Sequence, residues 1–169
     1  MKKFLVCLIM AVCSGVSFAQ IHNFGVSEAG KVYWQKVYED ARSADAVVSA
    51  ILASGSFSGI TEGEGSITFH IDPRPVDVTA LGYRRMSVPM YTVNYDFSGQ
   101  ATLQFQEGRY RVTVQDMILM DSEGSEPIEF WAVSRGNMTK GFSATPSEIY
   151  DKFLDGLFGP QSSPLDNDW

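Results

Sequence analysis

Apolar and polar residues alternate along three successive segments of residues 91–120, and this period of two constrains the fold more than any other feature of the chain. The apolar positions are Tyr91, Val93, Tyr95 and Phe97, then Ala101, Leu103 and Phe105, and finally Tyr110, Val112 and Val114. Successive side chains of a strand point to opposite faces of a sheet, so each segment places its apolar residues on one face. The pattern predicts three neighbouring strands that share one buried face.

The turns between these segments determine how the strands pair. A two-residue turn at Glu107-Gly108 sets Phe105 opposite Tyr110, because glycine tolerates the backbone of a tight turn, and the pairs that follow are also apolar. A three-residue loop over 98–100 keeps the first two apolar rows opposite each other, whereas a shorter turn would bring one row to the wrong face. We therefore predict an antiparallel meander of three strands.

Shorter signals complete the secondary structure. Residues 31–39 are rich in β-branched and aromatic side chains, which favour a strand. Ser43 is placed to cap a helix that runs to about Ala53, because apolar residues recur there at helical spacing. The remaining segments are a Gly/Ser-rich loop at 54–65, a strand at 66–72, an irregular strand at 76–88, an acidic loop at 121–126 and an edge strand at 127–133.

A second helix closes the domain. Thr145-Pro146-Ser147-Glu148 matches a capping box with proline at the first helical position, and Gly159-Pro160 marks the helix end. The apolar face of this helix consists of Ile149, Tyr150, Phe153, Leu154, Leu157 and Phe158. Burying these side chains stabilises the helix by no more than the ordering of its backbone costs. The helix is therefore not stable alone and must lie on the sheet. The predicted fold class is α+β, with a single antiparallel sheet of about five to six strands, two helices on one face and the order β-α-β4-α.

The N-terminus has the features of an export signal. Lys2 and Lys3 precede an apolar run over 4–12, and small residues suit cleavage after Ala19. The apolar run is about half of the roughly 20 residues needed to span a bilayer, and the residue before Cys13 is not small, which disfavours a lipid anchor there. We therefore predict a periplasmic or secreted protein. Its predicted parts are a signal peptide (1–19), a flexible lead-in (20–30), one α+β domain (31–159) and a disordered tail (160–169).

Charge and cysteine content exclude several classes of function. The 169 residues include 20 acidic and 13 basic side chains, a net charge of −7 that becomes −9 once Lys2 and Lys3 leave with the signal (11 bases against 20 acids). Such an acidic chain is a poor binder of nucleic acid. Cys7 and Cys13 both lie in the signal, so the mature chain has neither a disulfide nor a thiol nucleophile. No later segment is long and apolar enough to cross a membrane.

Two motifs and the late amphipathic helix suggest a family. The motifs are KVYWQKVYE at 31–39 and GRYRVTV at 108–114, of which the second is the more specific. With them, residues 32–158 resemble a Bacteroidetes family of exported proteins that carry a domain of unknown function, described as having a TATA-binding-protein-like (TBP-like) fold. The resemblance implies a β-α-β4-α layout and supplies neither an activity nor catalytic residues. A TBP-like fold does not imply DNA binding, because fold alone does not determine function.

Few residues suggest catalysis or metal binding. His70 and Asp72 share one face of a strand, but a transition-metal site usually needs three or four ligands and no such cluster is found. The run 55–59 resembles a nucleophile elbow only superficially, because its central residue is Phe57 rather than serine. The acidic loop at 121–126 lacks the ligand spacing of an EF-hand. We therefore predict no catalytic residues, no metal and no cofactor.

The polar face of the meander is the candidate binding surface. Arg109 and Arg111 share this face of their strand, and Gln104, Gln106 and Asn94 are expected beside them; we call these five residues the polar platform. Thr113, Gln115, Thr102 and Thr92 are expected around the platform. Two guanidinium groups could receive a carboxylate, a sugar or a partner protein. The alternative is a solvated sheet face, kept polar so that sheets do not stack.

Three functions are compatible with these residues. The first is an exported, non-enzymatic binding or interaction domain that uses the polar face or the edge loops of the sheet, with a protein or small molecule of the cell envelope as its partner. The second is a carrier that holds a small apolar ligand between helix and sheet, lined by Tyr95, Phe97, Phe105, Tyr110 and Phe153. The third is an envelope hydrolase that uses a pair of carboxylates. The lack of a catalytic set favours the first.

Overall fold

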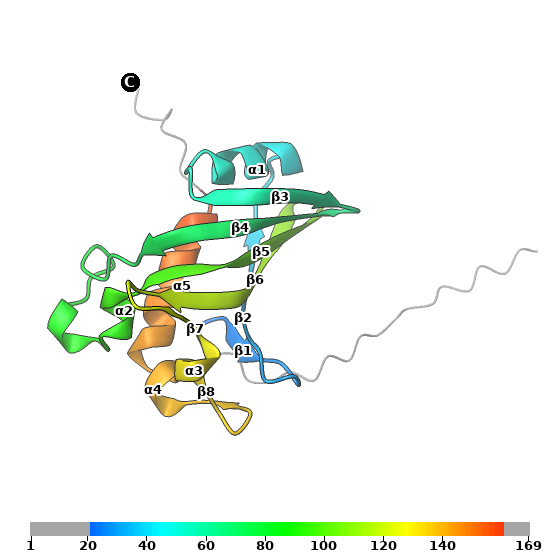
Figure 1. Ribbon diagram of the computed structural model, residues 1–169. Coiled ribbons are helices and arrows are strands. Elements are labelled where there is room, and N and C mark those ends of the chain that lie inside the picture. The colour runs from blue at the N-terminus through cyan, green and yellow to red at the C-terminus, as the bar shows by residue number, and fades with distance from the viewer. Residues whose placement is uncertain (1–20, 161–169) are drawn as a thin grey trace, which may run out of the picture.

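The computed structural model describes residues 21–160 (Figure 1). The predicted signal peptide and the tail over 161–169 lie outside these residues. In chain order the strands are β1 (Phe24–Val26), β2 (Val32–Glu39), β3 (Phe57–Gly63), β4 (Ser66–Pro75), β5 (Asp96–Gln106), β6 (Arg109–Met120), β7 (Ser125–Pro127), β8 (Val133–Ser134) and β9 (Asn137–Met138). The helices are α1 (Ala44–Leu52), the short 3-10 helix η1 (Arg85–Ser87), α2 (Tyr91–Asn94), α3 (Glu129–Ala132), α4 (Lys140–Ser143) and α5 (Thr145–Phe158).

The fold is α+β and is built on one antiparallel sheet of seven strands. Its strands lie side by side in the order β1-β2-β6-β5-β4-β3, and β7 pairs with the far end of β6. A separate two-stranded hairpin is formed by β8 and β9. The sheet has more strands than the five to six predicted, because β1 and β7 are short segments with too few residues to show a pattern of alternation.

One face of the sheet, which we call the inner face, is covered by α5 (Figure 1). Phe158 of α5 packs against Trp34 of β2 and Phe69 of β4, with ring centroids 6.3 Å apart in both cases. Near the start of the helix, Tyr150 packs against Phe97 of β5 at 5.6 Å. Nearly all of the predicted apolar face of α5 is buried in this core, and Val47 and Ile51 of α1 belong to the same core. In the described residues, no helix is long and apolar enough to cross a membrane.

The hairpin of β5 and β6 confirms the predicted turn and register. Phe105 pairs with Tyr110, and the pairs that follow are Leu103 with Val112 and Ala101 with Val114. Gly108 at the turn has a φ of 71°, a left-handed conformation that glycine adopts without strain. All of these apolar residues except Phe105, which is partly buried, lie in the buried core.

The predicted loop over 98–100 is wrong, because β5 continues through it and a β-bulge replaces it. Ser98 pairs with Ile118 and Gln100 with Gln115, so two residues of β6 stand opposite the single residue Gly99. The extra residue is Asp116, whose φ of 49° marks the irregularity. A Cβ atom on Gly99 would lie 3.3 Å from the Gln115 carbonyl oxygen, so the glycine permits a close approach of two strands rather than a chain reversal.

Several other predicted elements differ from the structure. The predicted first strand of the meander is interrupted at residues 91–94 by the one-turn helix α2, and the irregular strand at 76–88 is a series of turns ending in η1. The loop at 54–65 contains β3, and the edge strand at 127–133 is mostly α3. The glycines of β3 are typical of a loop, and the alternation of apolar and polar residues in α2 is typical of a strand. These local patterns led to the wrong predictions for both segments.

Of the two predicted helix caps, one is confirmed and one is wrong. Ser43 caps α1, and its side chain accepts a hydrogen bond from the Ala46 backbone nitrogen at 3.3 Å. In α5, however, Thr145 is already helical and Ala144 is the N-cap, so no side chain caps this end. Buried contacts rather than a capping box therefore hold the start of α5.

The lead-in predicted to be flexible contains β1. Its residue Phe24 is fully buried and packs edge-on against Phe142, with ring centroids 5.5 Å apart. The segment is also hydrogen bonded to α5: Asn23 Nδ2 donates to Asp151 Oδ1 at 2.7 Å, and His22 Nδ1 lies 2.8 Å from the Ser147 hydroxyl oxygen. The domain therefore begins at least seven residues earlier than the predicted residue 31, because β1 already includes Phe24.

Candidate functional site

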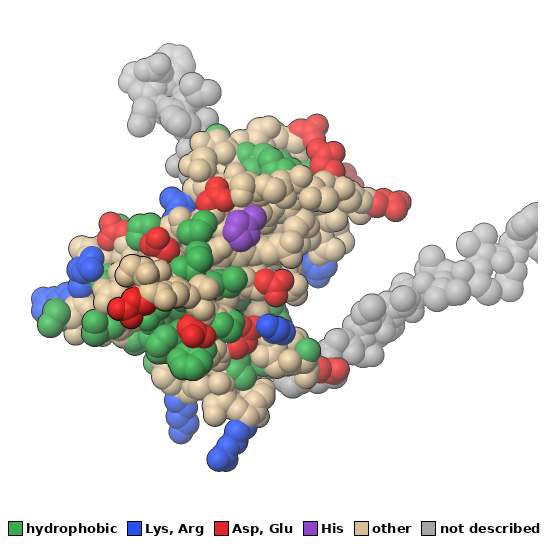
Figure 2. Space-filling model, viewed as in Figure 1, with side chains coloured by type: hydrophobic (Ala, Val, Ile, Leu, Met, Phe, Trp, Pro, Cys, Tyr) green, Lys and Arg blue, Asp and Glu red, His purple; other side chains and the backbone are tan. Residues whose placement is uncertain are grey.

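The opposite face of the sheet, which we call the outer face, is polar where β4, β5 and β6 meet. Figure 2, in the same view as Figure 1, shows mostly uncharged polar side chains and backbone over β3 and β4, whereas hydrophobic side chains gather over α2 and α3. Thr68 of β4 and Thr102 of β5 share a hydrogen bond of 3.1 Å on this face, and Gln35 Nε2 of β2 donates to Thr113 Oγ1 of β6 at 3.0 Å. Side chains on this face thus bond across strands and not to a covering helix.

Two arginine–glutamine pairs lie at the hairpin end of this face. Arg111 pairs in register with Gln104, and its Nε and Nη2 atoms both donate to Gln104 Oε1, at 3.0 and 2.6 Å. Arg109 is bound in the same way to Gln106 Oε1, at 3.0 and 2.7 Å. Strand pairing brings each glutamine opposite one arginine, so the spacing along the two strands builds both pairs at once.

The arginine–glutamine pairs orient the guanidinium groups without neutralising them. An amide oxygen accepts hydrogen bonds as a carboxylate does, but it carries no net charge. In the part of the chain that the structure describes, the ion pairs join Lys31 to Glu129, Lys36 to Asp155, Arg42 to Asp40 and Lys152 to Glu148. Neither guanidinium of the platform belongs to one of them. The Nη1 atom of each guanidinium is not used by its glutamine and remains a donor.

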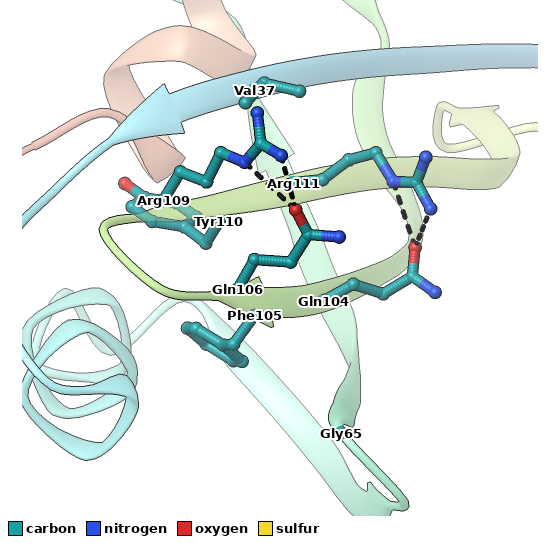
Figure 3. Close-up of a pocket in the computed structure, with 8 residues that line it drawn as sticks. All are labelled: Val37, Gly65, Gln104, Phe105, Gln106, Arg109, Tyr110 and Arg111. Carbon is teal, nitrogen blue, oxygen red and sulfur yellow. Dashed lines mark hydrogen bonds between the residues drawn. The ribbon is translucent and has the colours of Figure 1, made fainter. Parts of the chain in front are cut away.

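A hollow of about 400 Å3 lies beside the two pairs (Figure 3). Its lining consists of Val37, Gly65, Gln104, Phe105, Gln106, Arg109, Tyr110 and Arg111. Figure 3 shows both arginines and both glutamines on one side of the β5–β6 hairpin, whereas Phe105 and Tyr110 point to the other side. The alternation inferred from the sequence therefore places the charged groups toward solvent, Tyr110 in the core and Phe105 partly buried beside it.

Asn94, the fifth residue of the predicted platform, lies elsewhere, so from here on the platform means Arg109, Arg111, Gln104 and Gln106. It is the last residue of α2 and is not among the residues that line the hollow. Thr92 belongs to the same helix, is fully buried, and donates its hydroxyl hydrogen to the Pro89 carbonyl oxygen at 2.6 Å. The assumption that residue 91 begins a strand was the source of both errors.

His70 has a serine partner that the sequence did not reveal. Its Nε2 atom lies 3.0 Å from Ser98 Oγ, a spacing that a serine nucleophile and its base would have. However, Ser98 is 2% exposed and donates its only hydroxyl hydrogen to the Ile71 carbonyl oxygen at 3.1 Å. His70 Nε2 must then be the donor to Ser98, so the imidazole cannot take a proton from this hydroxyl in this arrangement. Asp72 instead accepts a hydrogen bond from Ser58 at 2.5 Å.

The acidic loop is organised by its own backbone. Asp121 Oδ1 accepts hydrogen bonds from the backbone nitrogens of Glu123 and Gly124, at 2.8 and 3.0 Å, and these bonds lower the pKa of the carboxyl. Over residues 21–160, no group of three or more metal-binding side chains is found. The loop is therefore a turn stabilised by its carboxylate.

Two carboxylates of α5 face the sheet and serve the packing of the helix. Asp155 Oδ1 accepts hydrogen bonds from Lys36 Nζ at 2.6 Å and from the Tyr38 hydroxyl at 2.8 Å. Asp151 Oδ1 accepts one from Trp34 Nε1 at 2.8 Å in addition to that from Asn23. Burial and the bond to Asp155 raise the pKa of Tyr38. One oxygen of each carboxylate thus accepts hydrogen bonds from two donors that lie outside α5.

Of the aromatic side chains considered as a ligand lining, Phe97, Tyr110 and Phe153 pack at the helix–sheet interface. Phe97 is fully buried and packs edge-on against Phe153, with ring centroids 5.4 Å apart. Tyr110 stacks on Tyr38 at 5.1 Å and donates its hydroxyl hydrogen to the Phe158 carbonyl oxygen at 2.6 Å. Three hollows of the described residues are lined by β2, β5, β6, α1 and neighbouring loops.

Comparison with known proteins gives a likeness in fold. No protein-family model and no curated protein matches the sequence. The solved structure of a DUF4468 family protein from Bacteroides ovatus has a TM-score of 0.52 and 14% sequence identity, over 80% of this chain and 86% of that one. A TBP-like protein from Parabacteroides distasonis has a TM-score of 0.47 and 13% identity, over 78% of this chain and 90% of that one. Both neighbours come from Bacteroidetes.

The Bacteroides neighbour is consistent with the resemblance, suggested by the sequence motifs, to a Bacteroidetes domain of unknown function. The TM-score of the Bacteroides protein is above 0.5, which shows a shared fold. At 14% identity the likeness concerns the fold and carries no function.

Proposed function

We propose that this protein is an exported, non-enzymatic binding domain whose contact surface is the outer face of the sheet. The observation that carries the proposal is the pair of arginine–glutamine contacts beside a hollow of about 400 Å3. An orienting hydrogen bond restricts an arginine before its ligand arrives, so less side-chain entropy is lost on binding. A face kept polar only for solubility needs neither oriented guanidiniums nor a hollow beside them.

The partner we propose is a protein or small molecule of the cell envelope. The Lys-rich start, the apolar run and the small residues before the expected cleavage site support export. The binding role without catalysis is supported by the Ser98–His70 contact, whose hydrogen-bond direction is wrong for a nucleophile. N-terminal sequencing of the protein recovered from the envelope tests the export step, and we expect its first residue to be Gln20.

Photo-crosslinking from single positions tests the binding face. Val37 lines the hollow and is 53% exposed, so a benzoylphenylalanine at this position would lie beside any bound partner. Met86 is 99% exposed on η1 and serves as the matched control position. We expect adducts to form in the native envelope from position 37 and to disappear when Arg109→Ala and Arg111→Ala are combined.

The control position decides how the result is interpreted. Equal adducts from positions 37 and 86 would indicate chance collisions and would reject the outer face as the contact surface. Adducts from position 37 that survive the double arginine substitution would reject the platform as its centre. Far-ultraviolet circular dichroism of each variant shows whether the fold is kept, which we expect because both arginines are exposed.

A further inference from the structure

The two arginine–glutamine pairs form a regular array. Arg109 and Arg111 are two residues apart on β6, as Gln106 and Gln104 are on β5. Side chains two residues apart on a strand leave the same face about 7 Å from each other. Figure 3 shows the two guanidiniums on the same face, each held by its own glutamine. The platform therefore offers two positive groups, held in the same way, at a fixed separation.

The array presents hydrogen-bond donors and few acceptors. Both glutamine oxygens already accept two hydrogen bonds from a guanidinium, which leaves the glutamine amide nitrogens and the arginine Nη1 atoms facing outward. A surface of this kind is matched by a ligand that contributes acceptors and negative charge. Planar carboxylates suit guanidinium groups best, because both oxygens can accept in the plane of the fork.

We propose that the platform binds a small dicarboxylate, one carboxylate at each arginine–glutamine pair. This inference rests on the outer face being the binding surface, and it adds the chemical class of the ligand. The separation of about 7 Å between the pairs selects for a dicarboxylate of matching length. A single carboxylate engages one pair, and a dicarboxylate that is too short cannot reach both.

One neighbouring charge makes the two pairs unequal. Glu39 of β2 stands in register with Arg109, whereas the uncharged Val37 stands in register with Arg111. Within the described chain, Glu39 is not among the carboxylates within 4.0 Å of a cation, so it lowers the local potential without blocking Arg109. The Arg111 side of the platform is therefore the stronger anion site.

Calorimetric titration of the purified protein at low ionic strength tests the proposal with pimelate as the long dicarboxylate. Succinate is the short dicarboxylate, and acetate is the single carboxylate. We expect pimelate to bind at least about tenfold more tightly than acetate, since the second carboxylate adds a charge-assisted contact. Equal affinities for pimelate and acetate would overturn the two-point site. Affinity for succinate equal to that for pimelate would overturn the length selection.

Isosteric charge changes provide the matched variants. Gln104→Glu keeps the shape and the contact with Arg111 but neutralises the guanidinium, so we expect about a tenfold loss of pimelate affinity. Gln100→Glu introduces the same charge on the same face of β5, about 14 Å farther along the strand. Both variants are compared with the unchanged protein at 0.15 M ionic strength, where that distance exceeds the screening length of about 8 Å, so Gln100→Glu should leave pimelate affinity unchanged. Equal losses in both variants would show a general field effect and would overturn the site.

Glu39→Gln should change pimelate affinity in the opposite direction. Removing this carboxylate should raise pimelate affinity about twofold, the size expected of an exposed charge pair. A loss of affinity in Glu39→Gln would contradict the proposed placement of the ligand. The test also separates this inference from the proposed function: if position 37 captures an arginine-dependent envelope partner while pimelate fails to bind, only the dicarboxylate assignment is rejected.

Discussion

The two faces of the sheet are formed by the same strands, but their polar groups are hydrogen bonded to different kinds of partner. On the inner face, polar atoms such as Trp34 Nε1 and the Tyr38 hydroxyl are paired with a carboxylate of α5. On the outer face, Arg109 and Arg111 are held by uncharged amide oxygens and keep donors free. Polar groups that join the sheet to α5 are bonded to its carboxylates, with the buried Tyr150 hydroxyl as an exception, whereas the outer-face guanidiniums are oriented and keep free donors. This difference is the strongest indication that the outer face has a function.

The largest effect is expected from removing an inner-face side chain. Leu103 is fully buried, and Leu103→Ala should lower the free energy of unfolding by about 2–5 kcal/mol through lost contacts and a cavity. Urea denaturation followed by circular dichroism measures the change. A loss of less than about 1 kcal/mol would mean that the core collapses around the cavity, and that the inner face is less rigid than the packing suggests.

The next effect concerns the polar contacts beneath α5. Asp151→Ala removes the acceptor of Trp34 Nε1 and Asn23 Nδ2, so we expect a loss of about 1–3 kcal/mol for the unpaired donors. Amide hydrogen exchange of β1 should increase at the same time, because Asn23 joins this segment to the helix. Unchanged exchange in β1 would show that the burial of Phe24 alone holds the strand.

A smaller effect on the free energy of unfolding depends on pH. Burial raises the pKa of Tyr110 to about 12, so the folded chain keeps this proton to higher pH than the unfolded chain, whose tyrosines ionise near their ordinary value of 10.0. The stability that this group contributes is full below about pH 10 and is lost as the pH rises toward 12. Tyr110→Phe should cost about 1 kcal/mol at neutral pH, through the lost bond to Phe158, and should make the alkaline loss less steep. Urea midpoints measured from pH 8 to 12 test both expectations, and an unaltered slope would contradict them.

The smallest effect on stability is expected on the outer face. Gln104→Ala removes an exposed side chain next to Leu103 and should change the free energy of unfolding by no more than about 0.5 kcal/mol. The same urea experiment provides the comparison with Leu103→Ala. A large loss in Gln104→Ala would mean that the arginine–glutamine pairs hold the sheet together, and the contrast between the two faces would then disappear.

The sequence predicted those parts of the molecule in which one pattern runs without interruption. The alternation from Ala101 to Val114 determined the hairpin register, and the helical spacing in 149–158 determined the buried face of α5. Both follow from side-chain periodicity, which needs no knowledge of distant residues. The same alternation placed Arg109 and Arg111 outward, and four of the five predicted platform residues lie together beside the hollow.

The remaining features depend on contacts between segments that are far apart in the sequence. β1 is held by Phe142 and Asp151, more than 110 residues away, and nothing near residue 24 indicates this. Gly99 is a residue typical of turns, and only the neighbouring strand β6 shows that β5 continues through it, opposite a bulge. The contact of Ser98 with His70 likewise depends on the pairing of β4 with β5. Such features are tertiary, so a local pattern cannot show them.

The irregularity at Asp116 has a consequence for changes in chain length. Before it, the side chains that enter the core are at even positions such as Val112, and after it they are at odd positions such as Met117. If this one residue were deleted while Met117 stayed anchored, the preceding half of the strand would rotate its side chains to the other face. Arg109 and Arg111 would then be driven toward the interior. The outward orientation of both arginines thus depends on a single added residue, and we expect a deletion there to be more harmful than any one substitution on the outer face.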